Sequence, residues 1–214
     1  MKKLDAIILA AGYGRRLRPL TLHTPKPLVK FRGKPLILYA MEPLMAIGVD
    51  RFLINAFWLS HRMKEFLEGT FGMEIILSRE RVLLGTGGGI RQFREIVSPI
   101  FIVHNSDIVH RIDIAGAVKR LRSSNAIGLM ILVDGPANSV LTDGERVMGF
   151  RKGEGLTYTG IGVFRREFMD YLPQRGSLIE GIVRAIEDGK TIIAYRTDAF
   201  WMDAGSRKSH AGTD

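Results

Sequence analysis

Short, nearly continuous apolar runs alternate along this chain with longer segments in which apolar residues recur at helical spacing. Such runs are typical of strands buried on both faces of a parallel sheet, whereas the helical spacing predicts amphipathic helices packed against that sheet. The predicted strands occupy residues 5–11, 51–57, 73–77, 100–104, 126–133, 158–164 and 191–195, and the predicted helices residues 35–47, 60–68, 88–96, 112–121 and 177–187. This alternation predicts an α/β fold with a mostly parallel sheet flanked by helices.

Two positions depart from the regular alternation. Pro43 lies inside the helix predicted at 35–47, where its missing N–H and its ring predict a kink or a split. Asp143-Gly144 separates two short segments, residues 139–142 and 146–150, and this dipeptide is a strong signal for a β-hairpin. We therefore expect a small hairpin insertion or edge element in the sheet.

Length and composition narrow the class of protein. The 214 residues fit one domain, so we expect a single domain over residues 1–214. The sequence has no cysteine, which excludes disulfides, thiolate catalysis and cysteine-ligated zinc and fits a reducing compartment. The apolar run at 6–11 is too short for a signal peptide, and no stretch of about 20 apolar residues could span a bilayer. A cytoplasmic protein with no membrane partner is expected.

The net charge of +9 favours polyanionic partners. Nucleic acid and nucleotide phosphates are both candidates, and general solubility explains the charge equally well. The charge alone does not separate these alternatives.

A glycine-rich, arginine-rich loop follows the first predicted strand. Gly12-Tyr13-Gly14-Arg15-Arg16 combines two glycines, which allow a sharp turn close to a ligand, with guanidinium groups that bind phosphate oxygens. In open α/β sheets, ligands bind at this edge, where the strands end. The loop is neither a P-loop nor a dinucleotide fingerprint, because the required lysine and third glycine are absent. It predicts a phosphate-binding loop, with an ordinary turn as the alternative.

A framed lysine lies shortly after this loop. Lys26 stands between Pro25 and Pro27, and proline restricts both its own φ and the residue before it. We therefore expect Lys26 to be presented from a stiff, extended backbone.

Together, residues 9–21 and 25–28 resemble the two-part signature of the sugar-1-phosphate nucleotidyltransferases. The resemblance implies a Rossmann-like fold of the nucleotide-diphospho-sugar transferase type. It implies that Lys26 stabilises charge during transfer and that Arg16 contacts phosphate and is catalytic. Arg15 stands where many members have Thr or Ser. The nucleotide-binding residues implied in this first segment are Ala10, Ala11, Gly12, Gly14, Arg15 and Arg16.

A second glycine segment follows the third predicted strand and opens a helix. Gly85, Thr86 and Gly87 begin a stretch that lets backbone groups approach a flat ligand near a helix N-terminus. The segment is similar to the base-binding segment of the same family, which implies that these three residues bind the nucleobase. A flexible surface turn is the alternative.

Carboxylates supply the predicted metal site. Asp107 ends an apolar strand, a position that suits a Mg²⁺ ligand or, alternatively, a helix cap. Ser106 replaces the glycine that is usual in the family, which puts the metal geometry and the turnover in question. Residues 200–206 resemble a second family motif, which implies that Asp203 is the other Mg²⁺ ligand and that Asp107 is catalytic.

The resemblance extends to the side of the sugar. Residues 158–164 look like the sugar-side strand of the family, which implies a sugar-phosphate role for Gly160. Lys152 matches a lysine that touches the sugar phosphate, although a solvated surface lysine is the ordinary alternative.

These observations predict a Mg²⁺-dependent enzyme that transfers NMP from a nucleoside triphosphate (NTP) to a sugar 1-phosphate and releases pyrophosphate. The chain is most similar to short forms acting on mannose, heptose or N-acetylmuramate 1-phosphate. Three alternatives stay open: a cytidylyltransferase acting on phosphocholine, a catalytically silent regulatory relative and a nucleic-acid-binding protein. We expect an NTP and a sugar 1-phosphate as partners rather than nucleic acid, and the base, the sugar and the oligomeric state are left open.

Overall fold

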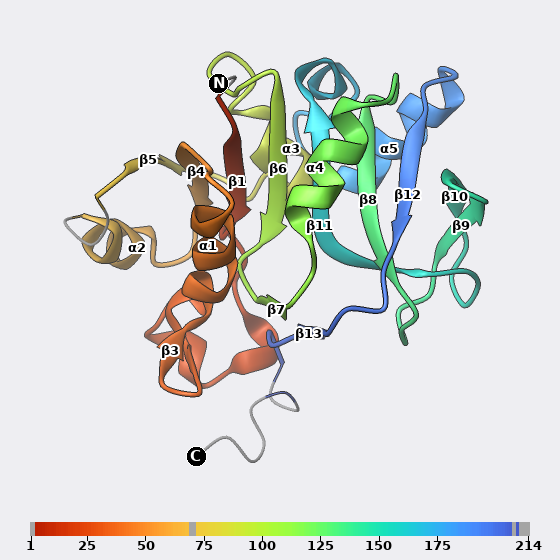
Figure 1. Ribbon diagram of the computed structural model, residues 1–214. Coiled ribbons are helices and arrows are strands. Elements are labelled where there is room, and N and C mark those ends of the chain that lie inside the picture. Colours follow the sequence, from red (N-terminus) through yellow and green to blue (C-terminus); the bar gives the residue numbers. More distant parts are fainter. Residues whose placement is uncertain (1–2, 69–71, 207–208, 210–214) are drawn as a thin grey trace.

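A nine-stranded sheet forms the centre of the computed structural model, which describes residues 3–68, 72–206 and 209 (Figure 1). Its strands, in spatial order, are β5 (Glu74–Arg79), β4 (Arg51–Ala56), β1 (Asp5–Leu9), β6 (Ile100–Asn105), β11 (Thr157–Arg165), β8 (Gly128–Val133), β12 (Ile192–Arg196), β10 (Arg146–Phe150) and β9 (Val140–Asp143). The prediction of a single domain extends over residues outside the described ranges and stays a prediction.

All strands of this sheet except β11 and β10 run in the same direction. The predicted mostly parallel α/β sheet is therefore confirmed. β11 lies antiparallel between β6 and β8, an arrangement that apolar patterning could not reveal because every buried strand has the same apolar character.

Helices cover both faces of the sheet. α1 (Leu36–Ala46), α2 (Ser60–Leu67) and α4 (Ile114–Arg122) pack on one face, and α3 (Gly85–Arg91) and α5 (Leu178–Glu187) pack on the other (Figure 1). Alternate residues of β1 supply the two cores, since Ile8 faces the first group of helices and Ile7 the second. The result is a three-layer α/β/α arrangement. None of the helices in the described residues is long and apolar enough to cross a membrane.

Two predictions about helices need correction or refinement. The helix predicted at 88–96 begins at Gly85 and ends at Arg91, so the glycine segment is itself helical. Close packing explains this: a Cβ added to Gly87 would lie 2.6 Å from the carbonyl oxygen of Ser177. Contact with the neighbouring segment thus overrides the low helix propensity of glycine. Pro43 does not split α1, which continues to Ala46.

The predicted hairpin is confirmed, and it forms the β10–β9 edge of the sheet. Arg146 pairs with Asp143, which leaves Gly144 and Glu145 in the turn, and the φ of Gly144 is 57°. The turn therefore begins one residue later than the Asp-Gly signal suggested.

Two small sheets were not predicted. β2 (Lys30–Phe31) pairs with β3 (Lys34–Pro35), and β7 (Ile108–His110) pairs antiparallel with β13 (Trp201–Asp203). Strands of two or three residues are too short to show periodicity. The β7–β13 pair matters most, because it joins the two predicted metal-binding segments.

Candidate active site

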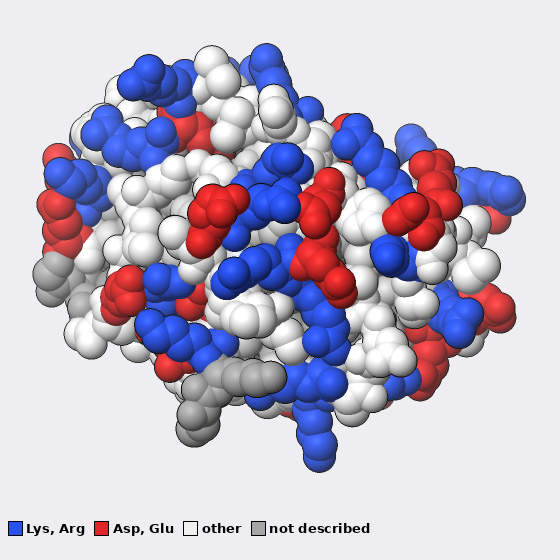
Figure 2. All heavy atoms as spheres, turned by 90° about the horizontal axis from the view of Figure 1, so that it is seen from above, with Lys and Arg blue, Asp and Glu red and all other residues white. Residues whose placement is uncertain are grey.

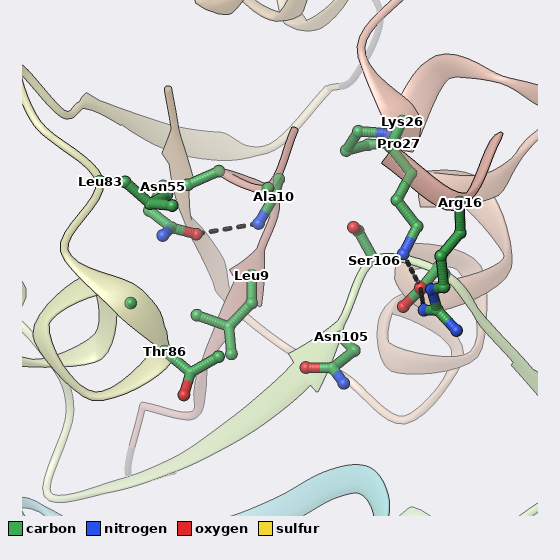
Figure 3. Close-up of a pocket in the computed structure, with 14 residues that line it drawn as sticks. Leu9, Ala10, Arg16, Lys26, Pro27, Asn55, Leu83, Thr86, Asn105 and Ser106 are labelled. Carbon is green, nitrogen blue, oxygen red and sulfur yellow. Dashed lines mark hydrogen bonds and ion pairs between the residues drawn. The ribbon is translucent and has the colours of Figure 1, made fainter. Parts of the chain in front are cut away.

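A cavity of about 320 Å³ opens where β1, β4 and β6 end and α3 begins (Figure 3). Eight of the predicted site residues line it: Ala10, Ala11, Gly12, Arg16, Lys26, Gly85, Thr86 and Asp107. Asn55, Asn105 and Ser106 also contribute to the lining. The cavity therefore lies at the carboxyl edge of the strands, where open α/β sheets bind ligands.

The glycine loop turns sharply at Gly14. Its φ is 65°, and a Cβ at this position would lie 2.7 Å from Cγ2 of Thr21, so only glycine fits without strain. The Thr21 hydroxyl donates to the carbonyl oxygen of Gly14 over 2.8 Å. Gly14 thus shapes the loop from outside the cavity lining, whereas Gly12 lies in the lining itself.

The two arginines of this loop point to different surroundings. Arg16 lines the cavity, whereas the guanidinium of Arg15 lies 5.2 Å from the centre of the Tyr13 ring. That distance is within the range of a cation–π contact. Arg15 does not line the cavity, and its predicted contact with the nucleotide stays a prediction.

Lys26 enters the cavity from a short 3₁₀ turn. The extended backbone predicted for Lys26 is found at Pro25 instead, and Lys26 itself begins the turn Lys26–Leu28. Its Nζ contacts Oδ2 of Asp107, and only 16% of the Lys26 side chain is exposed. The lysine is thus held by its backbone and by a carboxylate, as Figure 3 shows for the ion pair.

The β7–β13 pair brings the two predicted metal ligands together. Asp107 directly precedes β7, Asp203 pairs with Ile108, and the N–H of Ala204 donates to the carbonyl oxygen of Asp107 over 2.9 Å. Nη1 of Arg16 lies 2.9 Å from Oδ2 of Asp203, and its Nη2 lies 3.8 Å from Oδ2 of Asp107. The guanidinium group of Arg16 therefore reaches both carboxylates.

The surroundings of Asp203 favour its charged form. Partial burial raises its pKa, but the Arg16 hydrogen bond, the Gly205 N–H and the charges of Arg16 and Lys26 outweigh burial and hold the pKa below its ordinary value. The Gly205 N–H donates to Oδ1 over 2.7 Å. A Cβ at Gly205 would lie 2.1 Å from Oδ2 of Asp107, so glycine is needed beside these carboxylates.

This donor set fits a magnesium ion. The described residues contain no cluster of three or more His, Cys, Asp or Glu side chains suited to a metal. Two carboxylates would leave the other positions to phosphate oxygens and water, which is how Mg²⁺ is usually held. Ser106 is buried and has no positive φ, so the backbone here accepts a side chain in place of glycine.

The α3 glycine segment divides its roles. Gly85 and Thr86 line the cavity, and the Thr86 hydroxyl also accepts the Leu178 N–H over 2.8 Å. Gly87 lies outside the lining and donates its N–H to the carbonyl oxygen of Gly176 over 2.9 Å. Part of this segment therefore fixes α3 against the chain before α5.

The predicted sugar-side residues lie outside the cavity lining. Lys152 is exposed in the turn between β10 and β11. Gly160 has a φ of 80°, and a Cβ there would lie 2.4 Å from Nδ2 of Asn105, so β11 passes close to a cavity residue. Both sugar-phosphate roles stay predictions.

Sequence reasoning did not single out Asn55 or Asn105. Each is a polar residue in one of the last two positions of an apolar strand, which is close to the signal that identifies Asp107. That signal could have found them.

A buried histidine pair lies beside the Asp107 segment. His104 Nδ1 donates to the carbonyl oxygen of Asn105 over 2.7 Å, and His110 Nδ1 accepts the Ile112 N–H over 3.0 Å. The two Nε2 atoms are 3.1 Å apart. Because a neutral imidazole has one donor and one acceptor, His110 must donate to His104. The pair ties the end of β6 to β7.

Known proteins share both sequence and fold with this chain. The family described as nucleotidyl transferase matches residues 5–140. N-acetylmuramate alpha-1-phosphate uridylyltransferase from Neisseria meningitidis is 32% identical, with 95% of this chain and 94% of that protein covered. Mannose-1-phosphate guanylyltransferase catalytic subunit beta from Dictyostelium discoideum is 29% identical over 96% of this chain, which spans 62% of that protein.

A solved UDP-glucose pyrophosphorylase from Acinetobacter baumanii shares the fold. Its TM-score is 0.85 at 18% identity, with 100% of this chain and 92% of that chain covered. The sequence matches and the three-layer fold both point to the same family. The chain belongs to the nucleotidyl transferase family.

Proposed function

We propose that this chain transfers a nucleotidyl group from an NTP to a sugar 1-phosphate and releases pyrophosphate. One observation carries the proposal: Arg16, Lys26, Asp107 and Asp203 converge beside a glycine loop at the edge of the sheet where the strands end. Two cations and two carboxylates in one place suit a reaction between polyanionic phosphates. The names of the two sequence relatives support a sugar 1-phosphate as the acceptor.

The chemistry needs no covalent intermediate on the protein. The sugar phosphate is already an anionic nucleophile, so catalysis depends on bringing it in line with the α-phosphorus and on neutralising charge. Arg16 would hold the leaving pyrophosphate, and Lys26 would stabilise charge on the α-phosphoryl oxygens. Asp107 and Asp203 would hold Mg²⁺, which would supply positive charge to offset the negative charge of the phosphates.

The distribution of charge on the face seen in Figure 2 does not favour nucleic-acid binding there. Figure 2 looks down on the end of the molecule where β1 begins, and its basic side chains are interspersed with acidic ones. Several basic residues of the protein form ion pairs with acidic ones, including Arg120 with Glu145 and Arg94 with Asp170. A phosphate-tracking surface would instead gather unopposed basic residues.

Product formation tests the proposal. The protein would be incubated with Mg²⁺, each of five NTPs and each of three sugar 1-phosphates, those of N-acetylmuramate, mannose and glucose, and pyrophosphate release would be measured. The pair of UTP and N-acetylmuramate 1-phosphate comes first, because the relative named for it is covered almost completely. We expect release with one pair well above the others. Nucleotide binding without pyrophosphate release from any pair would indicate a silent relative.

A further inference from the structure

A polar pair, Asn55 and Glu80, lies at the end of the cavity away from the charged cluster. Asn55 is the penultimate residue of β4 and pairs with Leu9 of β1, and only 2% of it is exposed. Its Nδ2 donates to Oε1 of Glu80 over 2.7 Å. Figure 3 shows Asn55 with Ala10 and Leu83 on one side of the cavity and Arg16 and Lys26 on the other.

Each member of the pair holds one wall of the cavity. Oδ1 of Asn55 accepts the Ala10 N–H over 2.9 Å (Figure 3). Oε2 of Glu80 accepts the Leu84 N–H over 2.9 Å. Ala10 leads into the glycine loop and Leu84 directly precedes Gly85. One continuous set of hydrogen bonds therefore links the two backbone segments that line the cavity.

A glycine of α3 makes room for this pair. A Cβ at Gly89 would lie 2.5 Å from Nδ2 of Asn55 and 3.2 Å from Oε1 of Glu80. Gly89 is a buried residue in the interior of α3, a position where glycine lowers the stability of a helix. The close approach of Asn55 accounts for that glycine.

We propose that Asn55 and Glu80 are positioning residues for the nucleoside part of the NTP. They fix the distance between the segment that begins at Ala10 and the segment that begins at Leu84, so that the backbone groups of both face one flat base. This inference rests on the proposed function. The polarity of the pair is defined, because the Asn55 amide must accept from Ala10 and donate to Glu80 at the same time.

That polarity allows a reciprocal exchange. Asn55→Asp removes the donor and places a second carboxylate against Glu80. Glu80→Gln leaves either the Leu84 N–H or the Asn55 amide facing another donor. In the double variant, the amide at position 80 donates to the carboxylate at position 55, and its oxygen accepts the Leu84 N–H. The hydrogen bonds to Ala10, to Leu84 and within the pair are then restored with the donor and acceptor exchanged, and only the long 3.4 Å bond from Nε2 of Gln92 to Oε1 of Glu80 is lost.

Calorimetry with GTP, UTP and inorganic tripolyphosphate, each with Mg²⁺, tests the inference. Each single variant should weaken binding of the preferred nucleotide about tenfold or more, since an unpaired buried polar group is costly. Tripolyphosphate has no nucleoside, so its affinity should stay within about twofold of wild type. The double variant should bind the nucleotide within about threefold of wild type.

Three results would overturn the inference: single variants that bind nucleotide as wild type does, equal losses for nucleotide and tripolyphosphate, or a folded double variant that is no better than the single ones. The double variant decides the question even if a single variant does not fold. Ser98→Ala is the matched control, because Ser98 is buried and bonds to Asp5 at the far end of β1. It should lose stability but not nucleotide affinity. A wild-type protein that binds none of the five NTPs would overturn the proposed function as well.

Discussion

Arg16 donates to Oδ2 of Asp203 over 2.9 Å, and its guanidinium also lies 3.8 Å from Asp107. Lys26 contacts the same Asp107 carboxylate. Two basic side chains thus neutralise both carboxylates that would hold the metal. The same side chains are the proposed phosphate ligands, so an incoming triphosphate would draw them away and leave the carboxylates available.

The first prediction is that Lys26 weakens metal binding when no nucleotide is bound. Lys26→Ala should raise the affinity of the nucleotide-free protein for Mn²⁺ about fivefold or more, because it removes a positive charge in direct contact with Asp107. Electron paramagnetic resonance titration measures free Mn²⁺ directly. Lys34→Ala, which removes a lysine paired with Glu42, is the control and should leave the affinity unchanged. Equal Mn²⁺ affinities in wild type and Lys26→Ala would contradict the prediction.

The second prediction concerns the carboxylates. Asp107→Asn and Asp203→Asn should each lower turnover by about 100-fold or more, because each removes a charged magnesium ligand. Circular dichroism should show an unchanged fold, since neither group belongs to the apolar cores. A variant that keeps near wild-type turnover at saturating Mg²⁺ would exclude that residue as a ligand.

The third prediction is that Lys26→Ala lowers kcat more than it raises KM for the NTP. Its charge is directed at the reacting phosphoryl group and so matches the transition state better than the ground state. Steady-state kinetics at saturating sugar phosphate separate the two constants. A pure KM effect would assign Lys26 to ground-state binding.

The fourth prediction tests the role of Arg16. If Arg16 holds the leaving pyrophosphate, Arg16→Ala should weaken NTP binding while changing NMP binding little. One charge-assisted hydrogen bond is worth about 1.5–3 kcal/mol, which corresponds to roughly 10–150-fold in affinity. Calorimetry with NTP, NMP and a short oligonucleotide measures all three. Tight oligonucleotide binding without measurable NTP binding would contradict the proposed nucleotidyltransferase activity.

Local signals in the sequence were sufficient for most of the fold. The apolar run of β1 and the spacing of α1 and α5 follow directly from burial, which is why these elements lie within two residues of their predicted bounds. The position of β11 between β6 and β8 depends on pairing between distant segments. No local pattern encodes that pairing.

The candidate site shows the same limit. Asp107 was predicted from its place after a strand, but Asp203 rested on resemblance alone. The three-residue pair of β7 and β13 brings them together, and strands so short carry no periodic signal. Position 205 must be glycine because the Asp107 carboxylate lies where a Cβ would be. This close approach arises only in the folded chain, so no local sequence pattern predicts it.

The fifth prediction is that the protein loses stability in mild acid because of the histidine pair. Burial, followed by the charge of His110, lowers the pKa of His104 from 6.5 to about 3, and burial lowers the pKa of His110 to about 4. The unfolded chain therefore binds protons first as the pH falls. Stability should be highest above pH 6.5 and decrease from there toward pH 4, by about 1.4 kcal/mol per pH unit for each histidine protonated only when unfolded.

Urea unfolding at several pH values between 7.5 and 4.5 measures this slope. His110→Asn keeps an oxygen that can accept the Ile112 N–H but removes one titrating group, so its stability should depend less steeply on pH. His23→Asn, which replaces an exposed histidine, should keep the wild-type slope. The carboxylate of Asp203, whose pKa is lowered, loses its contribution at still lower pH and does not obscure the histidine window. A slope that is the same in wild type and His110→Asn would show that the pair is not the group whose protonation unfolds the protein.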